Sequence, residues 1–293
     1  MTRTTPTFAR FASLAANSNL HHPRHPRLEI SAKIQETGDA VLLLLKLCLV
    51  PALVGSVTLA TRRWGPRIGG WLTALPIIAG PTLCFYAIEQ GNEFAAGAAQ
   101  ATLAGLVGVA AHSVTYARSC RRWSWRASLF IAWFAFAAVT ALFYLAQPDL
   151  LWSLILALIS FVVAKRILPP RRSEAGVSRN PARDLLLRMA AALGLVFALT
   201  STANRLGPAL SGFLTPFPIA TAIIAAFTQA EHGPDAVAAY FHGFVPALNS
   251  FAFFCFVFAS SLSRIGLPLA LALALCVQLL IQTFNLWRMM TRA

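Results

Sequence analysis

The chain has 293 residues, of which 57% are hydrophobic and only 12% are charged, and its formal net charge is +14. A soluble domain of this length does not need so much apolar surface, because a single hydrophobic core stops growing before that. The composition therefore excludes an ordinary soluble enzyme. It also argues against binding to nucleic acid, since the basic residues lie in short runs between apolar stretches and form no basic face.

The N-terminal stretch, residues 1–39, is polar and contains a histidine- and proline-rich run at 21–26. It lacks the apolar core of a signal peptide, so we expect a disordered tail, with the first membrane helix acting as an uncleaved signal. A histidine run can also bind metal, but we assign this one no role.

Long apolar stretches occupy most of the remaining chain. A bilayer core of about 30 Å requires about 20 apolar residues per helix. On that basis we predict an all-α, polytopic transmembrane bundle that contacts the lipid bilayer. Its nine helices are expected at 41–60, 66–88, 94–116, 127–146, 150–165, 185–203, 208–230, 237–260 and 266–287.

Basic residues follow the first, third, fifth and ninth predicted helices, whereas Glu89, Glu93 and Asp149 lie in the opposite loops. Because basic loops remain in the cytoplasm, we predict a protein of the cell inner membrane with its N-terminus outside and its C-terminus cytoplasmic. Arg205 and Arg264 run against this trend. The basic groups are Arg62, Arg63 and Arg67; Arg118, Arg121, Arg122 and Arg126; Lys165, Arg166, Arg171, Arg172, Arg179 and Arg183; and Arg288 and Arg292.

An internal repeat relates the two halves of the chain at an offset of 142 positions. The motif Gly-Pro-x-x-x-Gly-x-Leu-Thr-x-x-Pro-Ile begins at Gly65 and again at Gly207, without a gap. Matches at glycine, proline, arginine and glutamate in one register are not expected from a bias toward alanine and leucine. The same offset pairs Lys46 with Arg188, Arg63 with Arg205, Phe85 with Phe227, Glu89 with Glu231, Gly91 with Gly233 and Arg122 with Arg264.

The repeat divides the chain into a first four-helix unit at 40–146, a linker helix with a basic cytoplasmic loop at 147–184, and a second four-helix unit at 185–293. Four helices return the chain to its starting side, and the unpaired fifth helix carries it across. We therefore predict that the second unit is inverted relative to the first. Inverted repeats of this kind are a hallmark of secondary transporters.

The repeated motif predicts interrupted helices near the middle of the bilayer. A proline there removes the hydrogen bond to the carbonyl four residues earlier, which is Leu72 or Leu214, and we expect Pro81 and Pro216 to add a second break in each helix. The repeated glycines allow close approach of a backbone or a ligand, and the threonines can bond the freed carbonyl or a substrate. Helix packing alone is the alternative interpretation. Matched breaks in two halves point to a transport site, so we predict substrate-binding residues at Gly70, Thr73, Pro76, Gly212, Thr215 and Pro218.

Four further polar residues within the predicted spans complete this candidate substrate site. Lys46 and Arg188 lie about one turn inside their helices, where they either reach to the membrane surface or bind an anionic group. Asn249 and His242 share one helix face, and their first-unit equivalents, Val107 and Gln100, make any site there asymmetric. No Asp or Glu lies inside a predicted span, which argues against energy coupling through a buried carboxylate.

No sequence pattern points to catalysis or a cofactor. The chain has no P-loop, zinc motif, nucleophile elbow or paired-carboxylate geometry, and its five cysteines fall in no metal-ligand or disulfide pattern. We therefore expect no cofactor, no metal site and no enzymatic activity.

The motif carries a resemblance. The segment 63–91 and its repeat at 205–233 resemble uncharacterised bacterial multi-pass membrane proteins that share a Gly-Pro…Gly…Leu-Pro signature. The stretch SGFLTPFPIATAII at 211–224 is also similar to part of the small, four-helix GlpM-like membrane proteins. The resemblance covers about a fifth of the chain. It implies a fused pair of four-helix units and no particular substrate.

The first functional hypothesis is a secondary transporter or permease for a small solute or a lipid-like molecule, with its site between the two broken helices. The second is a membrane subunit or scaffold that does not transport and that assembles with other proteins, or with copies of itself, through its helix faces. An intramembrane enzyme is the third and least supported.

Overall fold

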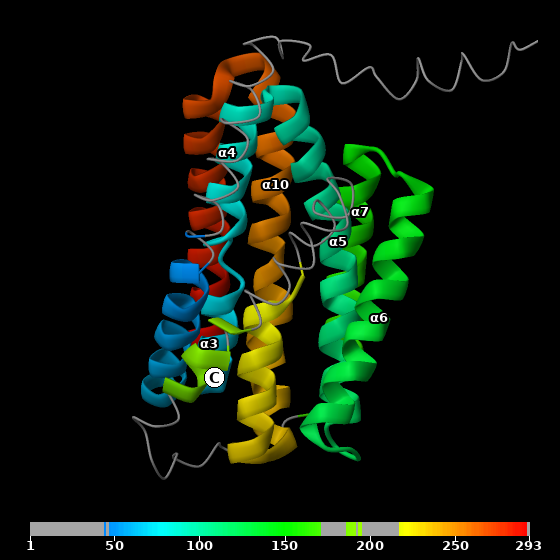
Figure 1. Ribbon diagram of the computed structural model, residues 1–293, viewed down its shortest axis with the longest axis vertical. Coiled ribbons are helices and arrows are strands. Elements are labelled where there is room, and N and C mark those ends of the chain that lie inside the picture. Colours follow the sequence, from blue (N-terminus) through cyan, green and yellow to red (C-terminus); the bar gives the residue numbers. More distant parts are fainter. Residues whose placement is uncertain (1–43, 45–46, 171–185, 192, 195–216, 292–293) are drawn as a thin grey trace, which may run out of the picture. The chain divides into compact units, whose positions relative to one another are not determined.

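The computed structural model describes residues 44, 47–170, 186–191, 193–194 and 217–291. The chain divides into Met1–Asp39 and Ala40–Ala293, and all described residues belong to the second unit. Every regular element in the described ranges is a helix (Figure 1). Among the described residues, four helices are long and apolar enough to cross a membrane: Asn92–Ser119, Trp125–Ala146, Leu150–Ile167 and the interrupted run Ile219–Thr291.

The predicted helix at 66–88 is two helices, α3 (Pro66–Thr73) and α4 (Ala79–Gln90). The break follows from Pro76, which has no N–H to donate to Leu72. The amide of Leu75 turns back to the Leu72 carbonyl instead, at 3.2 Å. The helix therefore stops rather than bends. The expected second break at Pro81 is wrong: Pro81 lies in the first turn of α4, where its missing N–H removes no helical bond.

Three helices follow with short connections, and they agree with the predicted spans to within a few residues. Gly91 (φ 90°) separates α4 from α5 (Asn92–Ser119), because this left-handed conformation is open to glycine at little cost. Next come α6 (Trp125–Ala146) and α7 (Leu150–Ile167). Asp149 caps α7 by accepting a hydrogen bond from the Trp152 amide at 2.9 Å.

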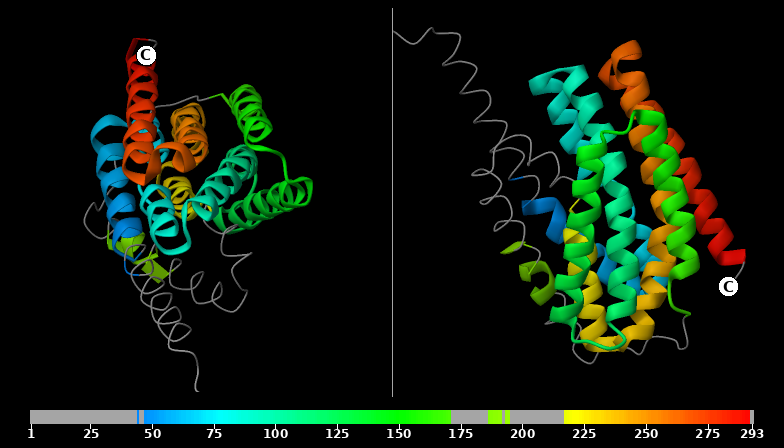
Figure 2. Two further views of the ribbon diagram at one scale, coloured as in Figure 1. Left: turned by 90° about the horizontal axis from the view of Figure 1, so that it is seen from above. Right: turned by 90° about the vertical axis from the view of Figure 1, so that its right-hand side faces the viewer.

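The last helical run, α10 (Ile219–Thr291), has 73 residues and would extend about 110 Å if it were straight. Gly233 (φ 77°) and Gly266 (φ 75°) interrupt it, and the chain reverses direction at each (Figures 1 and 2). Three segments result: 219–232, 234–265 and 267–291. They replace the predicted spans 208–230, 237–260 and 266–287, the first of which begins outside the described residues.

The centre of the packing is α5, which contacts α4, α6, α7 and α10, while α3 packs against α10. Tyr116, Phe241 and Phe254 are fully buried. In contrast, large apolar side chains such as Phe134 (76% exposed), Leu145 (78%) and Leu280 (72%) cover outward faces of α6 and of segment 267–291. Water does not tolerate such extended apolar surface, so these faces are of the kind that contacts lipid.

A buried polar cluster joins α3 to the last two segments of α10. The Gln282 side chain donates to the Trp71 carbonyl at 2.8 Å, and the Trp71 indole donates to the Gln282 carbonyl at 3.1 Å. The Ser250 hydroxyl donates to the side-chain amide oxygen of Gln282, at 2.5 Å. Gln282 is only 2% exposed, and these bonds satisfy both ends of its side chain.

The C-terminal end of α5 lies beside the turn at Gly233. Tyr116 donates to the Gln229 side chain at 2.9 Å, and Arg121 pairs with Asp235 at 3.2 Å. The 28 residues of α5 span about 42 Å, and Gly91 stands at the other end. The turns at Gly91 and Gly233, which are 142 positions apart in the sequence, therefore lie at opposite ends of the bundle (Figure 1).

A candidate anion pocket beside the broken helix

The glycine of the first repeated motif lies against a neighbouring backbone. A Cβ on Gly70 would overlap the carbonyl oxygen of Tyr240 and would lie 2.8 Å from the Phe244 nitrogen. The approach is reciprocal, because a Cβ on Gly243 would overlap the Arg67 carbonyl. Of the two predicted uses of Gly70, close backbone packing is the one observed here.

Thr73 is buried in the last turn of α3. Its hydroxyl donates to the Gly69 carbonyl at 2.8 Å, and not to the Leu72 carbonyl that Pro76 leaves without its usual partner. The Leu72 carbonyl already accepts a hydrogen bond from the Leu75 amide. Thr73 thus makes the local bond that threonine commonly makes inside a helix.

The carbonyls of the two repeated prolines accept the same helical hydrogen bond at the start of the helix that follows each of them. The Pro76 carbonyl accepts from the Gly80 amide at 2.9 Å, and the Pro218 carbonyl accepts from the Ala222 amide, also at 2.9 Å. These two bonds are equivalent under the 142-residue offset. Three other predicted site residues, Gly212, Thr215 and Lys46, lie outside the described residues.

Arg188, a predicted site residue that carries a charge, is buried, with 3% exposure. Its guanidinium pairs with the Glu231 carboxylate at 2.8 Å and lies 5.1 Å from the centre of the Phe227 ring. The Arg188 side chain therefore forms an ion pair inside the protein and does not reach to the surface. The sequence paired Glu89 with Glu231 and Lys46 with Arg188, yet it did not reveal that an acid of one pair meets a base of the other.

Two residues that lie 142 positions apart in the sequence bond the chain at the two ends of α7. The Gln100 side chain donates to the Pro148 carbonyl, just before α7, at 2.8 Å. The His242 Nε2 lies 3.0 Å from the Pro169 carbonyl, just after α7. A carbonyl only accepts, so Nε2 carries the proton in this contact. Gln100 and His242 are related by the 142-residue offset of the sequence, and they bond the chain at opposite ends of α7.

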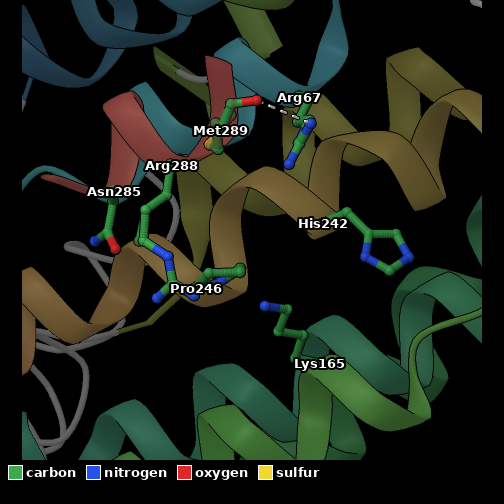
Figure 3. Close-up of a pocket in the computed structure, with 8 residues that line it drawn as sticks. Arg67, Lys165, His242, Pro246, Asn285, Arg288 and Met289 are labelled. Carbon is green, nitrogen blue, oxygen red and sulfur yellow. Dashed lines mark hydrogen bonds between the residues drawn. The ribbon is translucent and has the colours of Figure 1, made fainter. Parts of the chain in front are cut away.

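His242 also lines a pocket of about 170 Å³ at the end of the bundle where α3 begins and α7 ends. Figure 3 shows Lys165 extending from α7 toward Pro246, while Arg67 comes from α3 and Arg288 from the last turn of α10. The pocket is lined by Arg67, Lys165, His242, Pro246, Ala247, Asn285, Arg288 and Met289.

The described polar groups of this pocket are almost all hydrogen-bond donors. Arg67, Lys165 and Arg288 carry permanent positive charge and cannot accept. The Asn285 side-chain nitrogen is buried and has no hydrogen-bond partner among the described residues. None of the described lining residues is acidic. Such a set of groups is complementary to an oxyanion, which offers only acceptors and negative charge.

The sequence predicted only His242 among the pocket residues. Arg67, Lys165 and Arg288 served there as signals of membrane orientation, and their placement on one predicted side of the bilayer agrees with their convergence on one pocket. Asn249, which was expected to act with His242, is half-buried and does not line this pocket. Within the described residues, no group of three or more His, Cys, Asp or Glu side chains could hold a metal ion.

The chain matches no protein-family model, and comparisons with curated proteins and with solved structures found no match.

Proposed function

We propose that the protein is an integral membrane permease of the secondary-transporter type that is built from two inverted units and moves a small solute or a lipid-like molecule. The apolar outward faces of α6 and segment 267–291 support insertion in a bilayer. The equivalent turns at Gly91 and Gly233, at opposite ends of the bundle, support the inverted relation of the two units.

The observation that carries the proposal is the attachment of α7 at both ends by equivalent residues. Gln100 of the first unit bonds the chain just before α7, and His242 of the second unit bonds it just after. An inverted pair that rocks about a fixed element opens one end while the other end stays closed. In this proposal, opening the pocket end breaks the bond between His242 and Pro169, and opening the far end breaks the bond between Gln100 and Pro148.

The helix break at Pro76, and an equivalent break that we propose at Pro218, are the interruptions on which such a motion depends. Helices that are interrupted at corresponding places in two halves are typical of transporters, because free backbone groups at membrane depth need a cavity or a partner. The carbonyls of both prolines accept the same hydrogen bond, from the amide four residues later, at 2.9 Å.

The test is solute or lipid movement by the purified full chain in liposomes, measured against empty liposomes. Pro76→Leu and Pro218→Leu are expected to reduce the flux at least tenfold, while Pro81→Leu, in the first turn of α4, serves as the matched control. If no solute or lipid moves and the Pro76 and Pro218 variants behave like the control, the proposal is wrong. In that case a stoichiometric partner found by crosslinking in native membranes would favour a non-transporting subunit.

A further inference from the structure

We propose that the pocket between α3, the end of α7 and the end of α10 binds a phosphate-type oxyanion, and that this group is the charged part of the molecule the permease carries. Only the claim that the oxyanion is part of the transported molecule rests on the proposed function. The claim that the pocket binds an oxyanion rests on the residues that line it.

The first argument is charge. Arg67, Lys165 and Arg288 come from three separate parts of the chain and converge on one small pocket. None of the described lining residues is acidic, so the positive charges of these three side chains together attract an oxyanion, and a dianion most strongly.

The second argument is the unpaired donor. The buried Asn285 nitrogen lacks a hydrogen-bond partner in the described part of the chain, and a buried donor without a partner is expensive. An oxyanion supplies the missing acceptor and at the same time accepts from the guanidinium groups. A neutral or cationic ligand would not satisfy both requirements.

The third argument is position. The pocket includes His242, which also bonds the chain at the end of α7. A ligand that draws the His242 ring into the pocket therefore competes with the bond to Pro169. Occupancy of the pocket and release of α7 are in this way coupled through one side chain.

The pocket has room for such a group. A volume of about 170 Å³ accommodates a phosphate or a phosphate ester head. Outward-facing apolar residues such as Leu280 and Trp287 (59% exposed) lie on the same segment as Arg288. The phosphate can thus belong to a free solute or to an anionic lipid whose chains lie along that segment, and the experiment separates the two sources.

The experiment measures binding to the purified full chain by calorimetry, at low ionic strength. One arm titrates inorganic phosphate into protein in uncharged detergent. The other titrates a soluble, short-chain phosphatidic acid into protein held in phosphatidylcholine nanodiscs. Lys165→Gln and Arg288→Gln are each expected to weaken binding about ten- to one-hundredfold, the usual effect of losing a charge-assisted bond. Both side chains are exposed, so neither change should disturb folding.

Arg166→Gln is the matched control, because Arg166 is the exposed neighbour of Lys165 and does not line the pocket. It is expected to change affinity less than twofold. Asn285→Asp is a second probe: it places an acid in the pocket and should abolish binding. Phosphate binding with this variant pattern supports a free phosphate solute, and binding of phosphatidic acid alone with the same pattern supports a lipid.

The inference is overturned if neither probe binds, or if Arg166→Gln weakens binding as much as Lys165→Gln. The two proposals fail separately. If liposomes show flux that Lys165→Gln does not change, and neither probe binds, the permease proposal stands and the oxyanion site is wrong. If binding shows the expected variant pattern but no flux is found, the oxyanion site stands and the permease proposal is wrong.

Discussion

Replacing Gly70 with alanine tests the close packing of α3 against segment 234–265. The added Cβ would overlap the Tyr240 carbonyl oxygen and would lie 2.8 Å from the Phe244 nitrogen and 3.0 Å from the Tyr240 carbonyl carbon. Ordinary contacts of this kind are about 3.5–4 Å, and a backbone cannot turn aside as a side chain can, so the two helices must separate by about 1 Å. Overpacking of a tight interface costs about 1–3 kcal/mol, and the rigid neighbour places Gly70→Ala at about 3 kcal/mol.

The assay is thermal unfolding of the purified full chain in a mild detergent, followed by tryptophan fluorescence. For a protein of this size, about 3 kcal/mol corresponds to a fall of roughly 6–12 °C in Tm. The control is Gly97→Ala on α5, where a Cβ would meet nothing within 4 Å and where alanine favours the helix. The reasoning is refuted if Gly70→Ala unfolds at the same temperature as Gly97→Ala.

Three further predictions concern stability and reactivity. Gln282→Leu removes the buried bonds that join α3 to segment 267–291 and should cost about 1–2 kcal/mol, measured by the same unfolding assay; no loss of stability would contradict the role of the cluster. Glu231→Gln leaves the Arg188 charge without its carboxylate and should cost about 2–3 kcal/mol, of which the double change Glu231→Gln with Arg188→Met should restore a part; an additive loss in the double variant would count against the pair. Burial raises the pKa of the Cys120 thiol, in the turn after α5, to about 12, so at pH 8 it stays protonated and should react with iodoacetamide at least about tenfold more slowly than a free cysteine; mass spectrometry of the folded chain that finds rapid modification would refute this.

Local chemistry explains why the broken helix at Pro76 could be predicted from the sequence. Proline cannot donate a backbone hydrogen bond, so Pro76 marks a helix interruption, whereas the chain before Pro218 lies largely outside the described residues. Glycine followed by a helix start likewise marks Gly91 and Gly233 as turns, and both adopt positive φ. The expected break at Pro81 is wrong because Pro76 already ends α3, so Pro81 falls in the first turn of α4, where a proline is tolerated.

Tertiary contacts explain what the sequence did not predict. Nothing near Gly70 in the chain shows that Tyr240 will fill the space beside it, since the two are 170 positions apart. The same is true of the pocket, in which Arg67 donates to the carbonyl of Met289, at 3.5 Å. The charge pattern placed these residues on one predicted side of the membrane, but it could not distinguish a charged rim from a pocket. The unpaired Asn285 nitrogen has no sequence signature at all.

The inverted relation of the two units is tested most directly by the sidedness of equivalent positions. In a chain whose five native cysteines are replaced by alanine, Glu93→Cys and Asp235→Cys each introduce one thiol at equivalent places beside the turns at Gly91 and Gly233. An impermeant maleimide added to intact cells should label the thiol at position 93 and should reach the one at position 235 only after the cells are permeabilised. Labelling of both thiols from the same side of the membrane would contradict the inverted repeat and, with it, the proposed permease.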